Sequence, residues 1–169
     1  NDLLIIFSQN TARLFEIVNI AKVLGINRNV TSDYINTLRN TFLIKVDHNF
    51  TKSAMKRART NKKAYIAHSC IPIAMLEHDG NSIDGSDMGH LIETLVANNL
   101  SDTGFWRSPG KEEVDIVLKG PIPVEVKYRD NTGRKDIAGL ERFMDRFDAG
   151  TGIVEIGRAS CRERVCHRV

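Results

Sequence analysis

Apolar residues between positions 11 and 40 recur at helical spacing. The first group predicts a helix that ends at Gly25, and its members, at i, i+3, i+4 and i+7, are Ile17, Ile20, Ala21 and Leu24. Asn27 has the short polar side chain preferred at an N-cap, so a second helix is predicted to follow it. The buried stripe of this second helix is predicted to be Val30, Tyr34, Ile35 and Leu38. Two helices joined by a short turn indicate a helix-turn-helix.

Two strands are predicted next, at residues 42–46 and 64–67, and the loop between them is basic. A basic loop behind a helix-turn-helix is typical of a DNA-binding wing, whose cations attract phosphate whatever the base sequence. Exposed polar side chains of the second helix would meet phosphates and base edges. The predicted nucleic-acid-binding residues are Arg28, Asn29, Thr31 and Ser32 in the helix, and Lys52, Lys56, Arg57, Arg59, Lys62 and Lys63 in the wing at 52–63. The pattern leaves open a solvated surface on a protein-interaction module.

The remainder of the chain alternates helical and strand patterns, which predicts an α/β order and a mixed sheet. Its predicted elements are a short helix at 71–76, a polar loop at 78–87, a helix at 88–100, a strand at 104–107, a hairpin at 112–118 and 122–128, an amphipathic helix at 135–147 and a strand at 152–154. In the amphipathic helix, the residues predicted to face inward are Ile137, Leu140, Phe143, Met144 and Phe147.

The hairpin carries the candidate chemistry. Strand alternation places Glu113, Asp115 and Val117 on one face, and folding back at residues 119–121 would bring Asp115 beside Glu125 and Lys127. Mg²⁺ binds one or two carboxylates together with waters and substrate phosphate, and a nearby lysine orients the attacking water or offsets phosphate charge. The spacing of Asp115, nine intervening residues, Glu125 and Lys127 resembles the signature of the PD-(D/E)XK nuclease fold. The alternative is an amphipathic hairpin that shows its charges to water.

Composition sets limits on these interpretations. The 169 residues, 41% apolar and 27% charged, suit one ordinary globular domain or two small ones. The formal charge of +3 arises entirely from residues 157–169, which hold four Arg and one Glu, so the overall charge is no argument for nucleic-acid binding. Residues 156–165 back-translate to a string that resembles a sequencing adapter, so we expect residues 156–169 to be an artefact and natural sequence to stop near residue 155.

Cysteine usage points to a reducing compartment. Cys161 and Cys166 lie in the presumed artefact, which leaves Cys70, so neither a disulfide framework nor a zinc site is predicted. No apolar run is long enough to span a membrane and no signal peptide is recognisable, so a cytoplasmic location without membrane contact is expected. The oligomeric state is not predictable from these features.

Taken in order, the motifs resemble the C-terminal half of a family of archaeal-type AAA+ ATPases of bacteria and archaea. The residues that carry the resemblance are 24–28, 32–35, 43–45, 63–67, 89–93, 106–107, 113–117 and 124–127. The resemblance covers roughly residues 1–154. It implies a winged helix at residues 1–67 and an uncharacterised PD-(D/E)XK nuclease-like domain at 68–155. The N-terminal part then looks like a fragment whose ATP-binding module lies upstream. One departure is His68-Ser69-Cys70, where the family usually has Asp-Ser-Gly.

The resemblance also assigns roles. It implies that Glu93 is a helix-borne acid, that Asp115 and Glu125 hold Mg²⁺ or Mn²⁺, and that Lys127 completes the catalytic set. The expected fold is therefore α/β, or α+β overall, with a winged helix-turn-helix before a restriction-endonuclease-like mixed sheet flanked by helices. The first functional hypothesis is a DNA-binding, Mg²⁺-dependent nuclease module. The second is a non-catalytic module that binds DNA or protein and regulates the ATPase.

Overall fold

The computed structural model describes residues 2–53, 55, 57, 60–78, 85–129, 133–156 and 162–167. Within these ranges the chain forms six α-helices and two β-sheets, which confirms the predicted α+β class. The helices are α1 (Asp2–Gln9), α2 (Ile17–Leu24), α3 (Arg28–Asn40), α5 (Cys70–His78), α6 (Gly85–Asn98) and α7 (Ala138–Phe147), with a 3₁₀ turn η1 (Arg134–Asp136). The strands are β1 (Arg13–Phe15), β2 (Ile44–His48), β3 (Lys62–Ile66), β4 (Gly104–Arg107), β5 (Glu113–Leu118), β6 (Ile122–Lys127), β7 (Thr151–Ile156) and β8 (Arg162–His167). No described helix is both long and apolar enough to cross a bilayer.

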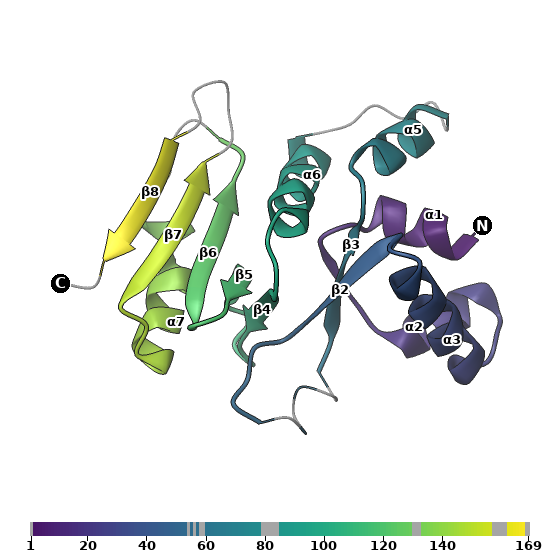
Figure 1. Ribbon diagram of the computed structural model, residues 1–169, viewed down its shortest axis with the longest axis horizontal. Helices are drawn as coiled ribbons and strands as arrows, with labels where there is room; N and C mark the ends of the chain where they lie inside the picture. The colour runs from purple at the N-terminus through teal and green to yellow at the C-terminus, as the bar shows by residue number, and fades with distance from the viewer. Residues whose placement is uncertain are drawn as a thin grey trace.

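The first sheet is antiparallel, in the order β1-β3-β2, and α1, α2 and α3 lie at its end of the molecule (Figure 1). The predicted turn between α2 and α3 is confirmed. Gly25 adopts a left-handed conformation (φ 65°) that ends α2, and the Asn27 side chain accepts a hydrogen bond of 2.7 Å from the Asn29 backbone N–H. The helical prediction is wrong at residues 13–15, because β1 pairs there with β3.

The buried face of α3 differs from the prediction. Val30 and Tyr34 are 41% and 55% exposed, whereas Thr31 and Ile35 are buried. Burial of Thr31 is tolerated because its hydroxyl donates to the Asn27 carbonyl oxygen at 3.0 Å, so no polar group is left without a partner. Ile35 and Leu38 pack in the core as predicted, so the prediction is wrong for Val30 and Tyr34 only. Periodicity treated Thr31 as polar and therefore left it out of the buried face.

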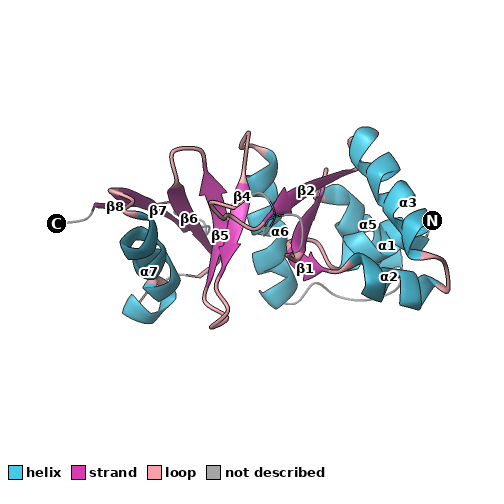
Figure 2. Ribbon diagram, turned by 90° about the horizontal axis from the view of Figure 1, so that it is seen from below, coloured by secondary structure: helices cyan, strands magenta, loops and turns pink. Residues whose placement is uncertain are grey.

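The second sheet has the order β4-β5-β6-β7-β8, and it is mixed because β6 and β7 are parallel. The crossover between β6 and β7 runs through η1 and α7, and α7 covers one face of the sheet, while α6 lies between the two sheets (Figure 2). The predicted inward face of α7 is confirmed: Leu140, Phe143 and Met144 are buried, and Ile137 and Phe147 pack against the same cluster. A second cluster joins α6 to the sheet and includes Ala97, Ile116, Val124 and Val126.

An irregularity in β5 changes the predicted alternation. Gly104 pairs with Val117 and Trp106 pairs with Val114, so β5 carries one extra residue over this interval. As a result, Val114 and Val117 both join the cluster under α7, whereas Ile116 joins the cluster under α6. The prediction that Val117 and Val114 lie on opposite faces is therefore wrong. β-Bulges are frequent beside functional sites, because they re-aim one side chain.

Polar contacts connect α6 and the second sheet to the first sheet. The Lys45 ammonium donates to the carbonyl oxygens of Ala97 (2.6 Å) and Leu100 (3.0 Å), which satisfies the C-terminal end of α6. Beyond β2, the Phe50 N–H donates to the Phe105 carbonyl oxygen, which links the chain after β2 to β4. The predicted domain boundary after residue 67 therefore lies within a closely connected region, and it stays a prediction.

Close approach of α7 to β5 depends on Gly139. A Cβ atom at this position would lie 2.2 Å from the Glu113 carbonyl oxygen. We expect Gly139→Ala to lower the free energy of unfolding by about 1–3 kcal/mol, because the helix must move away from the strand. Urea denaturation checks this, with Gly89→Ala as the control. A Cβ at Gly89 meets nothing within 4 Å, so Ala should leave stability unchanged or raise it by about 0.5–1 kcal/mol. Equal effects of the two substitutions would contradict the close contact.

Two further predictions concern the C-terminal strand and the loop before α6. The predicted strand at 152–154 is confirmed as β7, and residues 162–167 pair with it as β8. The proposed adapter origin of residues 156–169 stays a prediction. Most of the predicted polar loop, residues 79–84, lies outside the described residues, and α6 begins at Gly85, three residues before the predicted start.

Candidate functional site

The β5–β6 hairpin brings the predicted acidic residues together. One carboxylate oxygen of Asp115 accepts a hydrogen bond of 2.9 Å from the Val126 N–H, between Glu125 and Lys127. The Lys127 ammonium forms an ion pair with Glu125 Oε1. The Glu125 side chain is 8% exposed and that of Lys127 is 18% exposed. Asp115, Glu125 and Lys127 therefore form one half-buried cluster, as the sequence predicts.

Glu93 reaches the same region from α6. Its Oε1 atom lies 2.9 Å from the Lys63 ammonium, and it accepts a hydrogen bond of 3.1 Å from the Tyr65 hydroxyl. The Tyr65 hydroxyl also lies 3.4 Å from the backbone oxygen of Asp115. Tyr65 therefore connects Glu93 to the strand that carries Asp115. The family resemblance implied that Glu93 is a helix-borne acid of this site, but sequence reasoning did not identify Tyr65 as the link.

Lys63 is a cation buried among carboxylates. Its side chain is 1% exposed, and its ammonium lies 2.9 Å from both Glu93 and Glu113. The second oxygen of Glu113 pairs with Arg107 at 2.9 Å. We refer to the connected residues Lys63, Glu93, Glu113 and Arg107 as the buried ion network. The predicted exposure of Lys63 on a DNA-binding wing is wrong, because β3 inserts this side chain between α6 and β5.

The sequence did hold a signal for this arrangement. Lys63 and Tyr65 are two residues apart in β3, so they share one face of the strand. Because Tyr65 belongs to the apolar cluster under α6, Lys63 must approach α6 as well. The basic character of the preceding loop concealed this alternation.

The charges of these groups perturb one another. Burial, reinforced by the Asp115 carboxylate, raises the pKa of Glu93 to about 8 although Lys63 opposes this shift. Burial and then Asp115 likewise raise the pKa of Glu125 to about 7, against the opposing effect of Lys127. Burial alone would lower the pKa of Lys63, but the carboxylates of Glu93, Asp115 and Glu113 outweigh burial and raise it. The cluster thus concentrates ionisable groups with perturbed pKa values in a poorly hydrated place, which is typical of functional sites.

The donor set is compatible with a hard divalent cation. Glu125 Oε2 is buried and has no hydrogen-bond partner among the described residues, and the neighbouring Asp115 is a second carboxylate. Mg²⁺ or Mn²⁺ is commonly held by one or two carboxylates together with waters, so Asp115 and Glu125 suffice for this type of site. Within the described ranges, no three His, Cys, Asp or Glu side chains are grouped to hold a metal. A two-carboxylate site is therefore the form that fits.

The predicted nucleic-acid residues fall into three groups. Arg28 and Asn29 at the start of α3 are exposed and Ser32 is partly exposed; Lys52 and Arg57 are exposed near the β2–β3 connection, and Lys62 is partly exposed. Thr31 and Lys63 are buried, so their predicted exposure to DNA is wrong. Lys56 and Arg59 lie outside the described residues.

Comparison with known families finds one match. Residues 88–164 match the family described as a domain of unknown function, DUF4143, and this segment contains Glu93, Asp115, Glu125 and Lys127. The prediction of an uncharacterised domain in this part of the chain is confirmed. No curated protein and no solved structure matches the chain.

Proposed function

We propose that Asp115, Glu125 and Lys127 form a cation-dependent site that hydrolyses phosphodiester bonds in nucleic acid. The observation that supports the proposal most directly is Glu125 Oε2, a buried carboxylate oxygen without a hydrogen-bond donor beside a second carboxylate. A buried polar atom of this kind normally has a partner, and a bound cation would supply it. The proposal includes the wider assignment of this chain to an AAA+ ATPase, as its winged-helix and nuclease-like C-terminal module.

Each residue has a distinct task in this proposal. Asp115 and Glu125 would hold Mg²⁺ or Mn²⁺, which polarises a phosphoryl oxygen and activates a water when bound. Lys127 lies against Glu125, where its ammonium would orient the attacking water and offset charge on the phosphate. Glu93 would act as a positioning residue, because its contact with Tyr65 fixes the backbone at Asp115.

The first half of the chain would supply contact with DNA. The order of helices and strands from α1 to β3, with its three-stranded sheet, is compatible with a winged helix. In this reading, Arg28, Asn29 and Ser32 face the duplex from α3, and the exposed cations Lys52 and Arg57 attract phosphate.

Plasmid nicking tests the catalytic assignment. The full chain is incubated with supercoiled plasmid and Mg²⁺ or Mn²⁺, next to Asp115→Asn and Lys127→Ala. We expect nicking by the unmodified chain and about a hundredfold slower nicking by each variant, because each loses transition-state stabilisation. Lys119→Ala, an exposed lysine at the hairpin turn, is the control and should nick normally. Undiminished nicking by both site variants would refute the assignment.

Lys63 favours a second candidate function. A cation already buried between Glu93 and Glu113 neutralises part of the acidic cluster without any metal, which is the arrangement expected of a structural ion network. The module would then bind DNA or protein without catalysis and regulate the ATPase. This alternative predicts duplex binding that weakens with salt and that Glu125→Gln leaves unchanged.

A further inference from the structure

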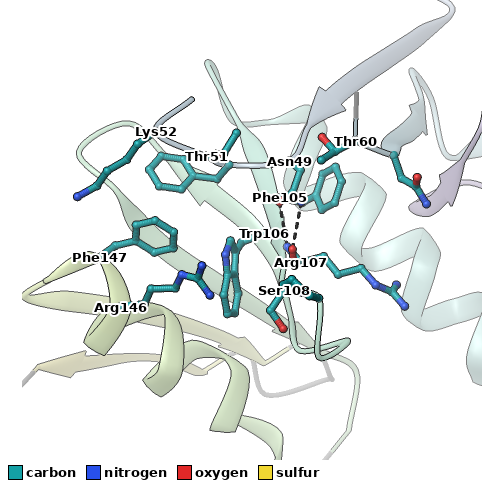
Figure 3. Close-up of a pocket in the computed structure, with 13 residues that line it drawn as sticks. Asn49, Thr51, Lys52, Thr60, Phe105, Trp106, Arg107, Ser108, Arg146 and Phe147 are labelled. Carbon is teal, nitrogen blue, oxygen red and sulfur yellow. Dashed lines mark hydrogen bonds between the residues drawn. The ribbon is translucent and has the colours of Figure 1, made fainter. Parts of the chain in front are cut away.

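A cleft lies where the chain after β2 meets β4 and the end of α7, and its lining contains Arg107 of the buried ion network but not Asp115, Glu125 or Lys127. It has a volume of about 700 Å³, within the range of roughly 300–1,000 Å³ typical of ligand sites. Figure 3 shows its lining, which comes from four segments of the chain, 49–52, 60–61, 105–109 and 146–147. The described residues that line it include three cations, Lys52, Arg107 and Arg146, and no Asp or Glu.

The wall of the cleft is aromatic, and its rings contact one another. Phe50 and Phe147 are partly buried and pack edge to face, with ring centroids 5.0 Å apart. Behind them, Trp106 and Phe143 are buried and also meet edge to face at 5.5 Å. These contacts fix the ring orientations, so the parts of Phe50 and Phe147 that remain exposed offer a prepared surface for stacking.

The cations are placed around this surface. The Arg146 guanidinium lies 5.8 Å from the Phe147 ring centroid and 6.0 Å from that of Trp106, and it extends towards Trp106 (Figure 3). Lys52 is exposed on the opposite part of the lining. Arg107 is held by Glu113, and its backbone is fixed by two hydrogen bonds with the Asn49 side chain, of 3.0 and 3.1 Å. Arg146 and Lys52 are therefore the cations best placed to meet an incoming anion.

We propose that this cleft binds a nucleotide unit of nucleic acid, with an unpaired base stacked on Phe147 and Phe50 and its phosphate contacted by Arg146 and Lys52. Rigid aromatic rings flanked by cations are the recurring elements of single-strand binding sites. A paired base is already stacked within its duplex, so the cleft selects single strands. This inference rests on the proposed nucleic-acid function and adds that the protein binds single-stranded nucleic acid.

Trp106 makes the proposal directly measurable, because it is the single Trp of the chain and lines the cleft. The full chain is titrated with a short oligothymidylate in EDTA while Trp fluorescence is recorded. Thymidine monophosphate and a hairpin duplex are the competitors. We expect the oligonucleotide to change the fluorescence saturably, and we expect the duplex to compete poorly. If the monophosphate competes at equal concentration, the cleft binds free nucleotides. If the monophosphate does not compete, the cleft binds nucleotides within a strand. Both outcomes support recognition of a nucleotide unit.

Variants separate stacking from charge. Phe147→Ala should weaken binding about tenfold, the effect expected from the loss of one stacked base. The double variant Lys52→Ala/Arg146→Ala should reduce the slope of log affinity against log salt by about 0.7, the value for one phosphate of a single strand, because both cations contact the same phosphate. Lys119→Ala is the matched charge control and should bind like the unmodified chain.

Three results would overturn the proposal: no binding, binding without a change in Trp106 fluorescence, or a double variant that binds like the Lys119→Ala control. The assay needs no divalent cation. A negative result here therefore leaves the nicking experiment valid, and an absence of nicking leaves this one valid.

Discussion

Lys63→Met is expected to lower the free energy of unfolding by about 3–5 kcal/mol, the usual cost of removing one partner from a buried ion pair. The Lys63 ammonium lies 2.9 Å from both Glu93 and Glu113, and its side chain is 1% exposed. Met retains much of the volume, so the loss comes from carboxylates left buried without their cation. The comparison is made above pH 8, where Glu93 is ionised in the folded chain. Because β3 belongs to the first sheet while its partners lie on α6 and β5, this loss also weakens the contact between the two sheets. Urea denaturation with two probes, circular dichroism and Trp106 fluorescence, measures the effect.

Lys62→Met is the matched control, because Lys62 precedes Lys63 in the same strand and is only partly buried. It should change the stability by less than about 0.5 kcal/mol. A second variant, Lys63→Met combined with Glu93→Gln, should recover part of the loss, with a coupling energy of about 0.5–3 kcal/mol. A cost below about 1 kcal/mol for Lys63→Met would show that the network contributes little to the fold.

Local signals in the sequence were sufficient for most elements. Gly25 and Asn27 define the turn between α2 and α3 through backbone conformation and capping, both of which depend on neighbouring residues only. The hairpin was likewise predictable from the sequence, because alternating apolar residues flank a turn at Gly120, where φ is 105°. The juxtaposition of Asp115 with Glu125 and Lys127 followed from the hairpin.

Features that depend on distant contacts were not predictable in this way. The extra residue in β5 is defined by pairing with β4, and it moves Val117 to the face of Val114. The exposure of Tyr34 depends on which side of α3 meets α2 and β2. The burial of Lys63 depends on carboxylates 30 and 50 residues further along the chain, which a periodicity within one strand does not reveal. The same limit applies to the cleft, whose lining comes from four separate segments.

Stability is expected to fall as the pH rises from about 5 to 8, the opposite of what paired carboxylates normally produce. Glu93 has a pKa of about 8 in the folded chain against an ordinary value of 4.5, chiefly because it is buried. Between these values the folded state keeps a proton that the unfolded state has released, so each pH unit removes up to about 1.4 kcal/mol per such group. The contribution is complete below the unfolded pKa and is lost as the pH passes about 8. Glu125, with a pKa of about 7, acts in the same direction.

Glu93 accounts for about 3–4 kcal/mol of this decline and Glu125 for about 2–3 kcal/mol, so the total should be about 6 kcal/mol. It is measured as urea midpoints at several pH values in EDTA with a constant slope in denaturant. Glu93→Gln should reduce the slope of stability against pH by about 1.4 kcal/mol per pH unit, which corresponds to one proton. The amide does not ionise, and its oxygen still accepts hydrogen bonds from Lys63 and Tyr65. Glu141→Gln, at an exposed position on α7, should leave the profile unchanged. A stability that rises over this pH range would mean that Lys63 keeps Glu93 ionised in the folded chain. The buried ion network would then stabilise the fold through a fully charged pair, and burial would not be the dominant effect on Glu93.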